Sequence, residues 1–397
     1  MRFLSNVKYI VLCLLLFLMA ISYHPYFFGD INAEVDVGNR VLSLPIYVVF
    51  GILVLLSLFT IRRINTKLFR VSIISLLIIL VVAELLFAFI DNSTMISDVR
   101  AWIMVIGSIV IGKSMEISKR QLVILISIYG LTALFSGIMQ VYQNIGGFII
   151  VDQYLANSKN SLGAIIATVV ISFIYLALYS KKTWRIFYYV LAVLGVAIVL
   201  TIRARASFLA LSLVAVIVFM KPTRSKGIGW TMAVISIFIL ALILLPDGIS
   251  NYVIDSITAG RERSDISSGR MEVYQGALAI LKNNPFFGNT FGQQQIGWVH
   301  NYLLLKLSNF GLIFAWPLLA YYFYLLLYCI KNMWNKTHLS KGFFIFSHGF
   351  ALLLVLFVIS MLEPTFPFAP GTAVAFNFIM LGLADSVLTS SKSKIVY

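Results

Sequence analysis

The 397-residue chain is 60% hydrophobic and 11% charged, with a mean hydropathy of +0.97, and this composition excludes an ordinary water-soluble globular protein. Its formal net charge of +15 raises the alternative of a nucleic-acid-binding protein, which the placement of the charges argues against. Apolar runs long enough to cross a bilayer recur along almost the entire chain and leave no room for a separate soluble domain. The sequence therefore predicts a single integral membrane domain over residues 1–397, with an all-α, polytopic fold.

About twelve apolar segments are long enough, or nearly so, to span a membrane as helices. The fourth and eighth are short. The first either stays as a span or is cleaved at a weak signal-peptidase site near Ala20-Ile-Ser22. In chain order the segments are residues 9–22, 44–61, 71–90, 101–112, 121–141, 161–180, 186–202, 206–220, 228–246, 301–330, 342–362 and 372–390.

Most lysines and arginines follow the even-numbered segments, as the positive-inside pattern requires. This placement predicts that both termini are cytoplasmic. It also explains the basic excess by membrane orientation and contact with membrane lipids, so no nucleic-acid partner is expected. The basic clusters are Arg62 to Lys67, Lys113 to Arg120, Lys181 to Arg185, Lys221 to Lys226, Lys331 to Lys341, and Lys392 to Lys394.

The longest polar segment, residues 247–300, is predicted to lie on the side opposite the termini. Within it, Met271, Tyr274, Leu278 and Leu281 recur at spacings of three and four residues. This periodicity predicts an amphipathic helix near 268–283, lying against the bundle or the membrane surface. We therefore expect a large, partly helical external loop.

Basic residues on this outer side are informative because the orientation pattern would not place them there. Arg203 and Arg205 lie between two apolar runs with almost no loop, so each guanidinium either reaches toward lipid phosphates or meets a partner. A guanidinium presents forked donors that match phosphate oxygens, which makes a substrate phosphate the alternative partner. Arg270 lies in the first turn of the predicted helix, where free backbone N–H groups also favour an anion.

Other residues of the long loop are weaker candidates for substrate binding. Arg261 and Arg263 alternate with acidic residues, so local salt bridges compete with binding as their role. Tyr274 and Trp298 are candidate contacts for sugars, although aromatic side chains at a membrane interface are also ordinary anchors.

His300 and Asn301 stand side by side at the predicted entry of the tenth span. A neutral imidazole held there can accept a proton near neutral pH, as a general base does. The competing role for a lone histidine is a structural hydrogen bond. Asn301 is the adjacent candidate for contact with the same substrate.

Two other pairs of charged residues suggest different chemistry. Glu84 and Lys306 fall inside predicted spans and need polar partners there, as in a transporter or flippase of a lipid-linked anionic substrate. Glu34 and Asp36 have an acid-x-acid spacing that can hold a divalent cation. Such pairs arise often by chance, and we expect no metal.

The chain resembles the bacterial O-antigen polymerase and O-antigen ligase superfamily in three motifs that occur in the family's order. The first is the arginine of RASFL, Arg205, followed by Leu209. The second is His300, followed after ten residues by Gly311. The third, SGRMEVYQGALAILKNNPFFGN, is similar to the family's external arginine helix and the Pro-Phe-Phe-Gly turn behind it. Together the motifs make the resemblance cover almost the whole chain.

The resemblance implies a GT-C-like glycosyltransferase bundle in the bacterial inner membrane, with its site facing the periplasm. The donor would be a glycan linked through pyrophosphate to a polyprenol. Arg205 and Arg270 would bind that pyrophosphate and stabilise the charge that develops on it. His300 would orient or deprotonate the acceptor hydroxyl, and a single displacement would invert the anomeric carbon. No cofactor is implied.

Polymerase and ligase share these parts and differ in the acceptor. A polymerase extends another lipid-linked repeat unit, whereas a ligase transfers the polymer to lipid A-core. The interval from Arg270 to His300 is short beside the insertion associated with ligases, which favours the polymerase. A chain-length regulator protein is a further partner that a polymerase would imply.

Overall fold

The computed structural model describes residues 2–28, 42–60, 67–89, 93–143, 158–202, 204–219, 270–290, 299–334, 343–364, 366–368 and 372–393. This described part contains helices and no strands, so the predicted all-α class is confirmed. Six of its helices are long and apolar enough to cross a membrane, as expected of a helical membrane protein.

Long runs of Leu, Ile, Val and Phe form helices because a helix bonds every backbone N–H and C=O within the segment, which hydrocarbon demands. The helices are α1 (Arg2–Ile21), α2 (Pro25–Phe28), α3 (Ser43–Thr60), α4 (Lys67–Phe89), α5 (Ser93–Ser114), α6 (Lys119–Gln143), α8 (Ser158–Tyr179), α9 (Lys182–Thr201), α10 (Arg205–Phe219), α13 (Arg270–Asn283), α14 (Tyr302–Trp334), α15 (Phe343–Ser360) and α16 (Thr372–Ser393).

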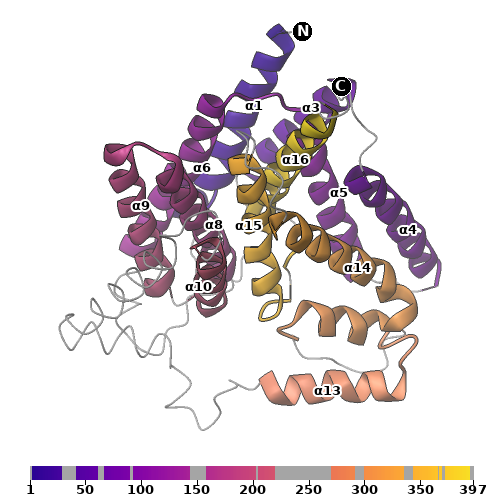
Figure 1. The fold of residues 1–397 in the computed structure, drawn as a ribbon. Coiled ribbons are helices and arrows are strands. Elements are labelled where there is room, and N and C mark those ends of the chain that lie inside the picture. The colour runs from indigo at the N-terminus through magenta and orange to yellow at the C-terminus, as the bar shows by residue number, and fades with distance from the viewer. Residues whose placement is uncertain are drawn as a thin grey trace, which may run out of the picture.

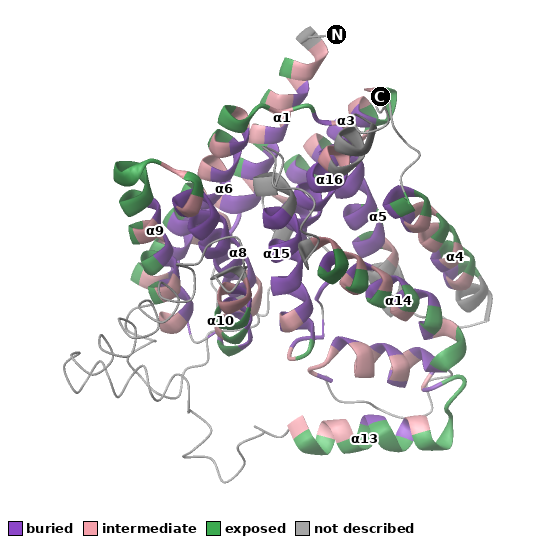
Figure 2. Ribbon diagram, in the orientation of Figure 1, coloured by how far each residue is buried: buried purple, intermediate pink, exposed green. Residues whose placement is uncertain are grey.

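The bundle has a buried centre and two distinct ends. Helices α8, α15 and α16 are buried through most of their length, whereas α3 and α9 expose many apolar side chains at the periphery (Figure 2). The start of α1 and the end of α16 lie at one end of the bundle, and α13 lies across the opposite end (Figure 1). We call these the terminal end and the α13 end.

Small residues bring α5 and α16 into backbone contact. A Cβ atom added to Gly112 would overlap the carbonyl oxygen of Ile379, and one added to Gly382 would overlap that of Ile109. Close approach of this kind strengthens van der Waals packing between membrane helices, where apolar burial alone gives little preference for a partner.

Several predicted boundaries are wrong. The fourth segment, predicted at 101–112, is the 22-residue helix α5, which continues through polar residues upstream of Ala101. Lys113, predicted to lie in a basic loop, is buried inside that helix. The predicted ninth span, 228–246, lies outside the described residues, and the total of twelve spans stays a prediction.

The span predicted at 301–330 corresponds to α14, but the sequence did not predict that this helix is broken at Gly311. This residue has φ 63° and ψ −177°, a conformation that favours glycine and interrupts the helical hydrogen bonds. The N–H groups of Leu312 and Ile313 donate instead to the carbonyls of Pro285 and Phe286, at 3.0 Å each. The turn that follows α13 therefore caps the second part of α14.

The same turn also caps the first part of α14. Asn289 N donates to Ser308 O at 2.8 Å, and a Cβ on Gly288 would lie 2.6 Å from both Ser308 O and Gly311 N. Gly288 has φ +56°. Residues 285–290 and the break at Gly311 thus form one interlocked unit, which we call the glycine clasp. It brings the Pro-Phe-Phe-Gly turn of residues 285–288 into direct contact with Gly311.

Candidate functional site

Three chain segments meet at the α13 end: the first turns of α13, residues 299–301 before α14, and residues 361–364 after α15. Tyr274 on α13 donates its hydroxyl to the carbonyl of His300 at 2.8 Å. Asn301 Nδ2 donates to the carbonyl of Met361 at 3.1 Å. These bonds connect segments that are far apart in the sequence.

Glu363 lies between Arg270 and His300. Its Oε1 is 3.9 Å from Arg270 Nη2, and its Oε2 is 3.8 Å from His300 Nδ1. The Glu363 side chain is 8% exposed, whereas those of Arg270 and His300 are 35% and 32% exposed. A buried carboxylate needs a compensating positive charge, and Arg270 supplies one. Both distances exceed hydrogen-bond range, so the guanidinium can still bind a further anion.

The backbone on both sides of His300 is fixed. The Asn301 side-chain oxygen accepts a hydrogen bond from Leu304 N at 2.9 Å, which makes Asn301 the N-cap of α14. Together with the Tyr274 bond to the His300 carbonyl, this cap fixes the position of the His300 backbone, from which the imidazole extends. An asparagine beside the histidine therefore has a structural function, while its predicted contact with substrate stays a prediction.

The hydroxyl of Tyr274 stays a donor at neutral pH. Burial raises the pKa of Tyr274 above its ordinary value of 10.0, the charge of Arg270 lowers it, and the charge of Glu363 raises it. The influence of both charges shows that Tyr274 belongs to the same electrostatic environment as Arg270 and Glu363.

Glu363 itself is positioned by the end of α15. Its backbone N–H and that of Leu362 both donate to Ile359 O at 2.9 Å, so the chain leaves α15 in a tight turn. The carboxylate is thereby held against the start of α14 rather than on a free loop.

Arg205 lies at the same end of the bundle. It follows Ala204, and a Cβ on Gly163 near the start of α8 would lie 2.5 Å from the Ala204 Cβ. Tyr175, late in α8, donates to the carbonyl of Ser347, early in α15, at 3.1 Å, so α8 and α15 run in opposite directions. The start of α8 is therefore at the α13 end, and Arg205 is exposed there as the first residue of α10.

Glu84 and Lys306 lie in the described part of the chain, whereas several other predicted residues do not. Glu84 is exposed on α4, while Lys306 is buried in the first part of α14. The Nζ of Lys306 lies 5.5 Å and 5.7 Å from the ring centroids of Tyr302 and Phe310. The predicted residues outside the described part of the chain are Arg203, Arg261, Arg263, Trp298, Glu34 and Asp36.

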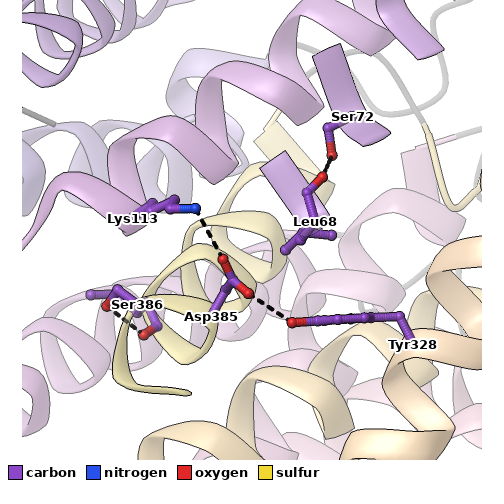
Figure 3. A network of polar contacts seen from close by, with 7 residues as sticks. Leu68, Ser72, Lys113, Tyr328, Asp385 and Ser386 are labelled. Atoms are coloured by element: carbon purple, nitrogen blue, oxygen red, sulfur yellow. Dashed lines mark hydrogen bonds and ion pairs between the residues drawn. The ribbon is translucent and has the colours of Figure 1, made fainter. Parts of the chain in front are cut away.

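A second buried carboxylate lies at the terminal end, where α5, α14 and α16 meet (Figure 3). Asp385 Oδ2 is 3.2 Å from Lys113 Nζ, and Asp385 Oδ1 accepts the hydroxyl of Tyr328 at 2.7 Å. The two charged side chains are 1% and 4% exposed. Lys8 donates nearby to Thr60 Oγ1 at 2.7 Å. We call Lys113, Tyr328 and Asp385 the terminal-end cluster.

Sequence reasoning missed Glu363 as a site residue and Asp385 as a partner of Lys113. Within the described residues no group of three or more His, Cys, Asp and Glu side chains is placed to hold a metal ion, and the expected absence of a cofactor stays a prediction. No protein-family model matches the chain, and no curated protein matches it.

Proposed function

We propose that the protein is a glycan polymerase of the O-antigen polymerase type, in the bacterial inner membrane. It transfers glycan from a polyprenyl-pyrophosphate donor to the hydroxyl of a lipid-linked repeat unit. One observation carries the proposal: Arg270 and His300, separated in the sequence, lie 3.9 and 3.8 Å from the two oxygens of one buried carboxylate, Glu363. The proposal places the α13 end on the periplasmic side and both termini in the cytoplasm.

The site residues match the charge changes of the reaction. The acceptor oxygen attacks the anomeric carbon while His300 takes its proton, and the bond from that carbon to the phosphate oxygen breaks. The electron pair of the broken bond stays on the pyrophosphate, where Arg270 stabilises the added negative charge. Arg205, exposed at the same end, is the second guanidinium for the pyrophosphate. A single displacement inverts the anomeric carbon.

The exposure of these groups supports the assignment. Arg270 and His300 are about one-third exposed, so both can meet a substrate while one side of each faces protein. Guanidinium groups bind phosphate oxygens through paired donors, and the 3.9 Å contact with Glu363 leaves those donors available.

Replacement of the two central residues tests the proposal in cells. We expect His300→Ala and Arg270→Ala to abolish long glycan chains while the amount of protein in the membrane stays normal. Lys282→Ala is the matched control, because Lys282 is an exposed basic residue in the last turn of the same helix. Full-length chains in either site variant would reject the assigned roles.

The ligase alternative gives a different phenotype. Loss of a polymerase leaves single repeats on lipid A-core, whereas loss of a ligase leaves none there and retains polymer on the carrier lipid. A transporter or flippase would depend on Glu84 and Lys306 more than on His300. Purified protein of that class would join no sugars.

A further inference from the structure

We propose that Glu363 is a positioning residue for His300, and that it also serves as the counter-charge of Arg270 until the donor binds. The part that concerns catalysis rests on the proposed function, since it takes His300 as the base. The part that concerns the imidazole does not, because it follows from the contact between Glu363 Oε2 and His300 Nδ1.

The position of Glu363 needs an explanation beyond anion binding. A carboxylate beside Arg270 repels a pyrophosphate and weakens its binding. The Glu363 side chain is also only 8% exposed, so its burial opposes folding unless its charge is compensated. A buried carboxylate that weakens anion binding and is costly to bury is expected to have another role. We assign that role to Oε2, the oxygen that faces His300.

The imidazole of His300, in turn, lacks a hydrogen-bond partner for its buried nitrogen within the described part of the chain. His300 Nδ1 is buried and has no hydrogen-bond partner among the described residues, and Glu363 Oε2 is 3.8 Å away. A small rotation of the ring brings this pair into hydrogen-bond range, with or without substrate. The carboxylate then holds the proton of the neutral ring on Nδ1, which leaves the lone pair of Nε2 for the acceptor hydroxyl.

The other charged and titratable groups near His300 do not provide this contact. From α13, Arg270 is cationic and Tyr274 is a donor to the His300 carbonyl. From α14, Lys306 is buried over two aromatic rings. Among the described residues, Glu363 is therefore the acidic group that faces the imidazole from the α15 side.

Steady-state kinetics of purified protein separate positioning from a merely structural role. In Glu363→Gln we expect kcat to fall about 10- to 100-fold, as loss of an orienting partner does elsewhere, while KM for the donor stays equal or falls because a repelling charge is gone. Glu363→Asp keeps the charge and should recover part of kcat. Equal kcat per folded protein in Glu363→Gln, or a raised donor KM, would overturn the proposal.

Asp385→Asn is the matched control, because it removes the charge of another buried carboxylate far from the site. It should reduce the amount of folded protein and leave the donor KM and the kcat of the folded fraction unchanged. A kinetic change equal to that of Glu363→Gln would show a general loss of packing and overturn the assigned role.

The tautomer of His300 gives a readout that needs no activity. In substrate-free protein labelled with ¹⁵N-histidine, at a pH where the ring is neutral, we expect the His300 signals to report a proton on Nδ1. His300→Gln identifies these signals, and Glu363→Leu should shift the proton to Nε2. A proton on Nε2 in the wild type overturns this inference even if glycan transfer is observed. If the predicted tautomer is found but the wild type transfers no glycan, the proposed function fails and the arrangement stands.

Discussion

Two buried carboxylates at opposite ends of the bundle have different surroundings. Asp385, at the terminal end, lies 3.2 Å from Lys113 and accepts a hydrogen bond of 2.7 Å from Tyr328. Glu363, at the α13 end, has partners at 3.8 and 3.9 Å that are each about one-third exposed. The first has short contacts inside the protein, whereas the second keeps its partners at a distance that a ligand can use.

The comparison distinguishes a structural ion pair from a candidate reaction site. Short, buried contacts such as those of Asp385 hold helices together and leave little capacity for a substrate. Longer contacts to partly exposed groups, as at Glu363, leave donors and acceptors that a substrate can satisfy. Burial of an acid alone would not separate the two cases, but the distances and the exposure of the partners do.

The largest expected effect is at the terminal-end cluster. Asp385→Ala leaves the charge of Lys113 buried without its partner, and we expect a loss of about 3–5 kcal/mol in stability. Thermal unfolding of the purified protein and its amount in the membrane measure this loss. Replacement of both partners, as Lys113→Met with Asp385→Leu, should restore most of it. A stable single variant would show that the pair is not structural.

The glycine clasp should show the next largest effect. Gly311→Ala places a side chain at a residue with positive φ and against the Phe286 carbonyl. We expect the free energy of unfolding to fall by more than about 1–2 kcal/mol. Glycan transfer should be lost as well. Gly276→Ala is the matched control, since a Cβ there meets nothing within 4 Å. The control should retain activity and gain about 0.5–1 kcal/mol from helix propensity. Wild-type activity in Gly311→Ala would contradict the role of the clasp.

Loss of the cap at Asn301 should have a smaller effect. Asn301→Ala removes the N-cap of α14 and the bond to the Met361 carbonyl, and we expect about 0.5–2 kcal/mol of destabilisation. Asn301→Asp keeps the capping oxygen and should be nearer to wild type in thermal unfolding. If both variants unfold as the wild type does, the cap contributes nothing.

The smallest expected effect is that of Tyr274→Phe, which removes one hydrogen bond to the His300 carbonyl. We expect the free energy of unfolding to fall by about 0.5–1.5 kcal/mol. Because burial raises the pKa of Tyr274 above 10.0, this contribution is fully present below pH 10 and is lost as the pH rises further. The difference in free energy of unfolding between the two proteins should be constant around neutral pH and should shrink only above pH 10. A difference that disappears near neutral pH would contradict the assigned donor.

Much of the fold could be predicted because the hydrocarbon requirement acts on each helix locally. Apolar runs located most helices, and the periodicity of Met271 and Leu278 located α13 to within two residues of its start. The start of α5 was missed because the polar side chains upstream of Ala101 end the hydropathy signal while the helix continues. The break in α14 was missed because one glycine does not reveal its φ angle without the turn that packs against it.

The site could be predicted only in part. Arg270 and His300 stood out because the orientation pattern and the helix position made each unusual by itself. Glu363 did not stand out because its meaning comes from partners that are distant in the sequence. Its one local signal is an acid that directly follows an apolar span, at the same predicted membrane side as the arginines. Lys113 was misplaced because charge placement assigns lysines to loops, and only the contact with Asp385 explains its burial.

Glycan transfer by His300 can be tested by incubation of the purified protein, in a lipid nanodisc without added metal, with a synthetic polyprenyl-pyrophosphate-linked repeat unit. We expect a ladder of extended lipid-linked products from the wild type and none from His300→Ala. Absence of extension by the wild type, or an undiminished ladder from His300→Ala, would contradict it.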